Sequence, residues 1–157
     1  MDWRIKLNAD GFADTYRLLY KRTKFSSLLI SKSKQDMRMI MPTFVNGALS
    51  CELYLKYLLD VPCKSHKIIE LINKLDGAKP GYKAKIENMT VCLMHTSHNA
   101  EYTSENYERD LSAINNAFVN LRYWYEPSKE VDCSYSQDFL DVFLAVLSSL
   151  AAQCERN

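Results

Sequence analysis

The most regular hydrophobic pattern in the chain lies between residues 36 and 60. Apolar side chains recur there at the spacing of one face of an α-helix. They are Phe44, Ala48, Cys51, Leu55 and Leu58. Pro42 either lies in the first turn of this helix or kinks a helix that begins earlier. The pattern therefore predicts a long amphipathic helix that ends before Pro62.

Weaker patterns predict further helices along the chain. Their ranges are 9–21, 65–75, 80–95, 104–126 and 137–153. Ser65 is placed to cap the second of these, and Thr103 or Ser104 to cap the fourth. Ser134 and Gln137 have capping-box spacing before the last. The stretch "TKFSSLLISKSKQ" predicts a loop or a short helix.

The low content of glycine and proline, together with the overall composition, favours an all-helical fold. The chain has only four glycines and four prolines, and it has no long alternation typical of strands and no internal repeat. A length of 157 residues suits one domain, and 47% hydrophobic with 25% charged residues is ordinary globular composition. We therefore expect a single all-α domain over residues 1–157. It should be an antiparallel bundle of five to six helices, in which helices 44–58 and 111–125 face each other.

Two charges interrupt the apolar part of the long helix. Glu52 and Lys56 lie four residues apart, in a row flanked by core-facing positions. One interpretation is an exposed ion pair that contributes about 0.2–0.5 kcal/mol. The other is a half-buried charge pair, which needs further partners because an unpaired charge in a low dielectric is costly.

The stretch "NNAFVNLRYWYEPSK" offers such partners. It carries Arg122 and Glu126 in one helical row, and a guanidinium binds a carboxylate through two hydrogen bonds. We hypothesise that Glu52, Lys56 and Arg122 form one polar cluster, with His66 and Tyr125 as outer members. The cluster would either set helix register or line a small cleft. The alternative for the aromatic residues is that they simply pack one end of the bundle.

Three segments together resemble the HEPN superfamily, the higher eukaryote and prokaryote nucleotide-binding domains. They are "NGALSCELYLKYLL", "HKIIELINKLD" and "FVNLRYWYE". Members share a helix with Glu and Lys in this context, a His that opens the next short helix, and an Arg near the end of a late helix. The resemblance covers residues 42–126. It implies a compact helical bundle that commonly dimerises and belongs to prokaryotic toxin, phage-defence or RNA-processing systems.

Many members of that family are metal-independent ribonucleases. Their site is an Arg followed by four to six residues and a His, paired across a dimer. No histidine follows Arg122 in that window, and the chain's histidines are His66, His95 and His98. We therefore expect a member that does not cleave RNA, although His66 could replace the missing group in space.

Other chemistry has weaker support. Cys63 with His66, and Cys92 with His95 and His98, do not have a recognised zinc spacing, so we predict no metal site. No motif for a cofactor is present, and nucleophilic catalysis by Cys63 with His66 lacks an identifiable orienting partner. The stretches "YKRTK", "SKSK" and "KPGYKAK" are either phosphate-contacting surfaces or solvated loops and helix ends.

Three of the five scattered cysteines (Cys51, Cys92 and Cys154) fall in apolar patterns that predict burial. The cysteines and the lack of a long apolar run favour a cytoplasmic chain without a membrane span.

Two functional hypotheses follow. The first is an RNA- or nucleotide-associated protein of a defence, toxin–antitoxin or RNA-processing system, acting as a homodimer with a partner such as a nucleotidyltransferase. The second is a helical dimerisation or protein-interaction module without ligand chemistry. A net charge of +1 does not separate them, because local clusters of lysine can bind phosphate whatever the total charge.

Overall fold

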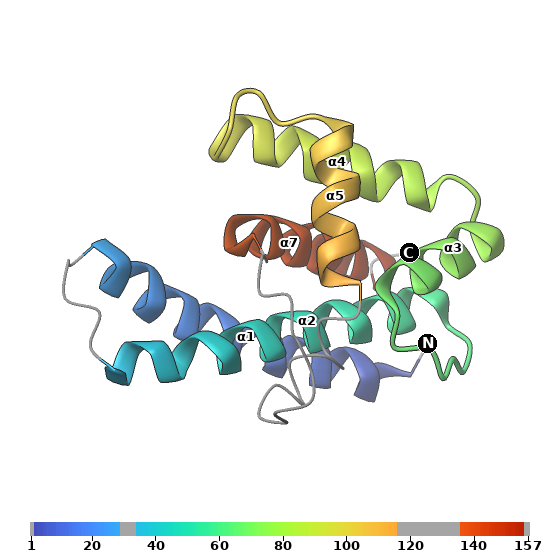
Figure 1. The fold of residues 1–157 in the computed structure, drawn as a ribbon. Helices are drawn as coiled ribbons and strands as arrows, with labels where there is room; N and C mark the ends of the chain where they lie inside the picture. Colours follow the sequence, from blue (N-terminus) through green and yellow to red (C-terminus); the bar gives the residue numbers. More distant parts are fainter. Residues whose placement is uncertain (1, 29–33, 116–135, 156–157) are drawn as a thin grey trace, which may run out of the picture.

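The computed structural model describes residues 2–28, 34–115 and 136–155. Within these ranges it contains six helices and no strand (Figure 1). The helices are α1 (Trp3–Leu28), α2 (Lys34–Leu59), α3 (Ile68–Ala78), α4 (Tyr82–Ser97), α5 (Ser104–Ile114) and α7 (Gln137–Cys154). The all-α helical bundle predicted from the sequence is confirmed. No helix in the described part of the chain has the length and apolarity needed to cross a membrane.

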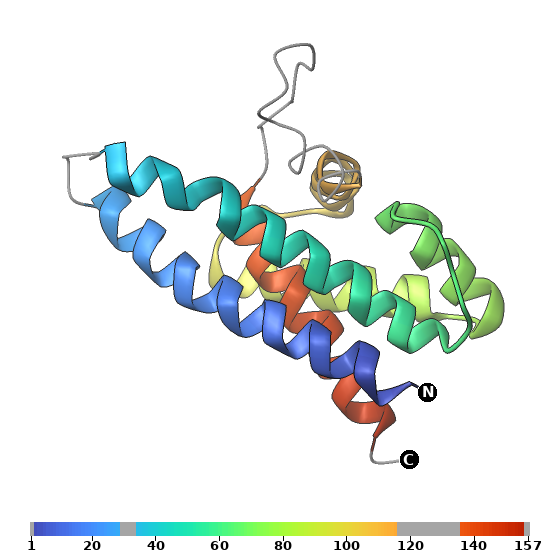
Figure 2. The ribbon, with the colours of Figure 1, turned by 90° about the horizontal axis from the view of Figure 1, so that it is seen from below.

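The centre of the fold is an antiparallel hairpin of α1 and α2, on which α7 packs (Figures 1 and 2). Tyr16 of α1 and Leu140 of α7 are buried against this centre. A Cβ atom added at Gly47 of α2 would lie only 2.8 Å from side-chain atoms of both residues. Glycine at this position therefore lets three helices approach closely.

The remaining helices form a second layer. α4 packs on α7, α3 packs on α2, and α5 contacts both α3 and α4. In Figure 1, α4 lies on the opposite side of α7 from the α1–α2 hairpin. The helix predicted over residues 111–125 was expected to face α2. Only its first residues are described, at the end of α5, and the described part of α2 packs mainly on α1, α7 and α3. The rest of that prediction lies outside the described residues.

The long helix carries the predicted buried seam. Phe44, Ala48, Cys51, Leu55 and Leu58 are all buried. The helix begins at Lys34, so Pro42 lies inside it rather than in its first turn. The predicted buried seam is confirmed. Of the two interpretations of Pro42, the structure agrees with the one in which the helix begins before this residue.

Two predicted boundaries need correction. α1 runs from Trp3 to Leu28, so the part of the expected loop or short helix at residues 23–28 belongs to this first long helix. α3 begins at Ile68, and Ser65 is not its cap. Instead Asn115 accepts hydrogen bonds from the first amides of α3, with its side-chain Oδ1 2.8 Å from Ile69 N and its backbone oxygen 3.2 Å from Ile68 N. A residue distant in sequence has taken the role that local spacing assigned to Ser65.

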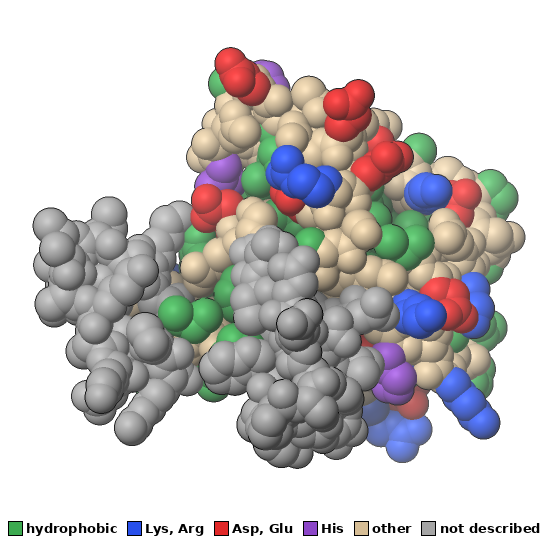
Figure 3. Space-filling model, viewed as in Figure 1, with side chains coloured by type: hydrophobic (Ala, Val, Ile, Leu, Met, Phe, Trp, Pro, Cys, Tyr) green, Lys and Arg blue, Asp and Glu red, His purple; other side chains and the backbone are tan. Residues whose placement is uncertain are grey.

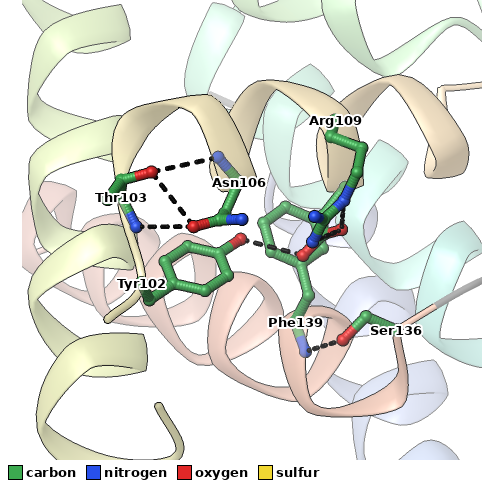
Figure 4. A network of polar contacts seen from close by, with 7 residues as sticks. Tyr102, Thr103, Asn106, Arg109, Ser136 and Phe139 are labelled. Atoms are coloured by element: carbon green, nitrogen blue, oxygen red, sulfur yellow. Dashed lines mark hydrogen bonds and ion pairs between the residues drawn. The ribbon is translucent and has the colours of Figure 1, made fainter. Parts of the chain in front are cut away.

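The start of α5 agrees with the sequence, and its end does not. Thr103 and Asn106 form a capping box, in which the Thr103 side chain accepts from Asn106 N and the Asn106 side chain accepts from Thr103 N (Figure 4). The helix ends at Ile114, where one continuous helix to Glu126 was predicted. The remainder of that range lies outside the described residues. Before α7, the cap is Ser136, whose hydroxyl accepts from Phe139 N.

Candidate functional site

Glu52 is the most deeply buried carboxylate that the structure describes. It projects from α2 and is only 2% exposed. Its Oε1 atom accepts a hydrogen bond from Lys56 Nζ at 2.8 Å and lies 3.0 Å from His66 Nδ1. The Glu52–Lys56 pair is therefore the half-buried charge pair of the second interpretation rather than an exposed surface pair. Because a carboxylate only accepts, the proton of a neutral His66 lies on Nδ1 in this contact.

The second oxygen of the same carboxylate differs from the first in its hydrogen bonding. Oε2 of Glu52 is buried and has no hydrogen-bond partner among the described residues. A buried acceptor without a partner costs about 1–3 kcal/mol, and native structures contain few of them. We call Glu52, Lys56 and His66 the Glu52 cluster. Its carboxylate has capacity for another donor.

The end of α2 brings the histidine back to this carboxylate. Asp60 adopts a left-handed conformation with φ of 58°, which ends the helix. The Nζ atom of Lys79 donates to the carbonyl oxygen of Leu58 at 2.7 Å and satisfies one of the terminal carbonyls. The segment that follows turns along α2 and places His66 next to Glu52, although fourteen residues separate them in sequence.

Two hollows, each of about 400 Å³, adjoin this segment. They share residues 61–64, so they lie on the two sides of one loop. Lys56 and Lys64 line the first hollow with Asp2 and Asp60, and Lys64 and Lys74 line the second. Figure 3 shows Lys and Arg side chains beside a histidine at the lower right, where α2 ends and α3 begins in Figure 1. The Glu52 cluster thus borders a surface that three lysines reach.

The structure brings together three of the predicted site residues. Glu52, Lys56 and His66 form one contact group, while Arg122, Tyr125 and Glu126 lie outside the described residues, so their membership stays a prediction. Sequence analysis missed the other lysines of the two hollows. The available signal was the density of lysine around the short loop "VPCKSHK".

Among the predicted basic stretches, "KPGYKAK" has an aromatic ring that already makes contacts within the chain. The ammonium groups of Lys79 and Lys85 lie 5.9 and 5.8 Å from the ring centroid of Tyr82. The Tyr82 hydroxyl lies 3.7 Å from Cys154 Sγ, and this contact is the main reason that the tyrosine pKa is raised. Cation–π contacts within the chain therefore occupy the ring that a base would otherwise stack on.

A second polar group holds the α4–α5 connection (Figure 4). Asp110 is only 7% exposed, and its carboxylate accepts from the Tyr102 hydroxyl at 3.0 Å and from two guanidinium nitrogens of Arg109. Burial and the nearby carboxylate raise the pKa of Tyr102. Because every carboxylate oxygen in this group has a partner, we assign it a structural role.

The cysteines and histidines considered for metal binding are not gathered. No three His, Cys, Asp or Glu residues in the described ranges are placed to hold one ion. Cys92, which was expected to be buried, is exposed on α4, whereas Cys51 is buried as expected and Cys154 is half-buried. His98 lies 3.6 Å from Asp138. The described cysteines and histidines therefore do not form a metal site.

Comparison of this chain with protein-family models, with curated proteins and with solved structures finds no match. The HEPN-like character of the chain therefore stays a prediction from the sequence.

Proposed function

We propose that this protein is a HEPN-like module that binds RNA or nucleotides through their phosphates and does not cleave RNA. Its setting would be a prokaryotic defence, toxin–antitoxin or RNA-processing system, as the sequence resemblance implies. The observation that carries the proposal is the position of Lys56. Its ammonium is held against the buried Glu52 carboxylate and also lines the first hollow.

The surrounding charges support phosphate as the ligand chemistry. Lys64 lines both hollows and Lys74 lines the second, so a phosphate in either hollow would meet at least one ammonium. Lys74 also pairs with Glu70 at 2.7 Å, but both side chains are about half exposed, so the pair is easily exchanged for a phosphate. A lysine whose position is already fixed by a buried carboxylate loses less entropy when a ligand binds.

The sequence argues against cleavage by the mechanism of that family, because no histidine follows Arg122 at the ribonuclease spacing. A metal-independent ribonuclease needs a group that exchanges protons near neutral pH, and histidine usually supplies it. His66 is the histidine of the Glu52 cluster, and its Nδ1 is held by Glu52 Oε1 at 3.0 Å. Cleavage would also require a second group to stabilise the charge that develops on the phosphate.

Binding of a fluorescent oligoribonucleotide and of ATP across a salt series tests this proposal. We expect binding that weakens as salt rises, because phosphate contacts release counterions. The double variant Lys64→Ala/Lys74→Ala should bind more weakly and show a smaller salt slope. Lys21→Ala is the control, since Lys21 lies about 24 Å along α1 from Ile5, which lines the first hollow. Equal losses in both variants would contradict the assignment.

The second functional class, an interaction module, has an observation of its own. Among the residues whose side chains are described, the three most exposed large apolar side chains all lie on α1. They are Trp3, Leu7 and Leu18. Soluble proteins tend to cover clustered apolar side chains with a partner. If the folded protein binds neither probe at low salt, this class replaces the first.

A further inference from the structure

A further hollow lies where α3, α4 and α5 meet (Figure 1). It has a volume of about 230 Å³, and it shares no lining residue with the two hollows beside the Glu52 cluster. Pockets for drug-sized ligands measure roughly 300–1,000 Å³, so an occupant of this hollow would be smaller. We call it the α3–α5 hollow, and what it binds is independent of the proposed function.

A buried phenol lines the α3–α5 hollow. Tyr107 of α5 is only 2% exposed, and its hydroxyl has no hydrogen-bond partner among the described residues. A buried polar group without a partner is costly, and native structures contain few of them. The Tyr107 ring packs edge-on against Phe139 of α7, with ring centroids 5.9 Å apart. Packing therefore fixes the ring, while its hydroxyl still has capacity for a hydrogen bond.

A half-buried carboxylate accompanies this phenol. Burial and the charge of Glu87 on α4 raise the pKa of Tyr107, so the phenol keeps its proton near neutral pH. Glu87 also lines the hollow, and its side chain forms no hydrogen bond or ion pair with the described residues. The wall of the hollow thus carries a neutral phenol and a negative charge that a ligand could bind together.

The rest of the wall is partly apolar. Three apolar side chains contribute to it, and they are Ile69, Ile72 and Leu111. Lys83 and Glu108 also line the hollow, but both are exposed and their charges have opposite sign. Because water screens exposed charges more strongly than half-buried ones, Glu87 dominates the preference of the hollow for charge.

We propose that the α3–α5 hollow binds a small primary amine with an apolar body. An ammonium group has three hydrogen-bond donors, so it can donate both to the Tyr107 oxygen and to the Glu87 carboxylate. The apolar body then lies against the apolar part of the wall, and its removal from water stabilises the complex. Because the Tyr107 hydroxyl is buried, side chains at the rim move when the ammonium reaches it. Lys83 and Glu108 can do so, since neither side chain is paired with a described residue.

Titration of the full chain with phenethylamine, followed by NMR of the backbone amides, tests this site. We expect saturable binding that shifts amide signals of α3, α4 and α5 around the hollow. Tyr107→Phe and Glu87→Gln should each weaken binding about tenfold, the scale of a lost hydrogen bond to a charged group. Glu105→Gln is the matched control, because Glu105 is exposed on α5 and does not line the hollow. Equal losses in Glu105→Gln and Glu87→Gln would overturn the proposal.

The charge of the ligand provides a second test. Hydrocinnamate resembles phenethylamine in shape but carries a carboxylate, so the Glu87 charge should prevent its binding. Phenethyl alcohol is neutral and should bind more weakly than the amine. An anion that binds as tightly as phenethylamine, or a folded chain that does not bind phenethylamine, would overturn the proposal.

Stability distinguishes a ligand-binding hydroxyl from a structural one. Tyr107→Phe removes a buried hydroxyl that has no partner among the described residues, so the urea midpoint should stay the same or rise. Tyr102→Phe should lower the midpoint, because the Tyr102 hydroxyl donates to the buried Asp110 at 3.0 Å. A midpoint that falls as far in Tyr107→Phe as in Tyr102→Phe would show that the Tyr107 hydroxyl stabilises the fold, and it would overturn its assignment to a ligand.

Discussion

His66 Nδ1 lies 3.0 Å from Oε1 of Glu52, the same oxygen that accepts the hydrogen bond of Lys56. The contact joins the α2–α3 loop to a carboxylate that is only 2% exposed. Because the unsatisfied Oε2 atom belongs to the same group, the site combines a stabilising ion pair with an unused acceptor. The buried ion pair underlies the first prediction.

Removing the carboxylate should destabilise the fold strongly. Glu52→Ala leaves Lys56, which is only 15% exposed, without its carboxylate partner. The substitution also removes the contact between Glu52 and His66 of the α2–α3 loop. Breaking a buried ion pair costs about 3–5 kcal/mol, and we expect a loss in that range from urea unfolding.

The exposed pair Glu70–Lys74 is the matched control. It has the same spacing and a similar distance of 2.7 Å, but both side chains are about half exposed. Glu70→Ala should therefore change the unfolding midpoint far less than Glu52→Ala. A loss below about 0.5 kcal/mol in Glu52→Ala would show that its pair behaves like a surface pair.

The start of α3 should depend on Asn115 rather than on Ser65. Asn115→Ala removes the acceptor of the Ile69 amide and should cost about 1 kcal/mol, the usual value for a lost cap. Ser65→Ala should cost less, because its hydroxyl is not the cap of this helix. Hydrogen exchange of the first α3 amides reports both variants, and greater exposure in Ser65→Ala would contradict the assignment.

Alkaline pH should destabilise the protein through buried tyrosines. Burial and the hydrogen bond to Asp10 raise the pKa of Tyr54 to about 12, above the ordinary tyrosine pKa of 10.0. Burial also raises the pKa of Tyr16 and Tyr107. A raised folded pKa means that the stability is fully present below pH 10 and is lost as pH rises toward 12.

Urea unfolding between pH 8 and pH 12 measures this loss. The variant Tyr54→Phe should show a shallower decline, because it has no phenol to ionise. Absorbance at 295 nm should show that tyrosine ionisation and unfolding occur together. Ionisation of all tyrosines near pH 10 in a protein that remains folded would contradict the prediction.

The purified chain should not cleave RNA. Arg122 can stabilise negative charge but cannot exchange a proton at physiological pH, and no histidine follows it at the ribonuclease spacing. The measurement is incubation with single-stranded and structured RNA in the presence of a chelator. Cleavage that is lost in both Arg122→Ala and His66→Ala would identify a relocated catalytic site.

Local spacing of apolar residues predicted the fold class, because this spacing indicates which face of each helix is buried. The seam from Phe44 to Leu58 has helical spacing, and all of its members are buried. Thr103 begins α5 because its capping partner, Asn106, is only three residues away. Such signals are local, so one sequence suffices to detect them.

Features that depend on distant partners were not predictable. Nothing next to Ser65 indicates that Asn115 will cap α3, because the two segments meet only in the folded chain. Cys92 follows an apolar spacing, but α4 turns this side chain toward solvent. For Glu52, spacing alone allowed both an exposed and a buried pair, and the packing of its neighbours decides between them.

Histidine-selective NMR tests the central claim most directly, because the chain contains three histidines and one of them belongs to the Glu52 cluster. Addition of an oligoribonucleotide or ATP at low salt should shift the ring signals of His66, while those of His95 on α4 stay unchanged. The same addition to Lys64→Ala/Lys74→Ala protein should produce smaller shifts at equal ligand concentration. Saturable binding that shifts His95 or His98 and leaves His66 unchanged would contradict the account.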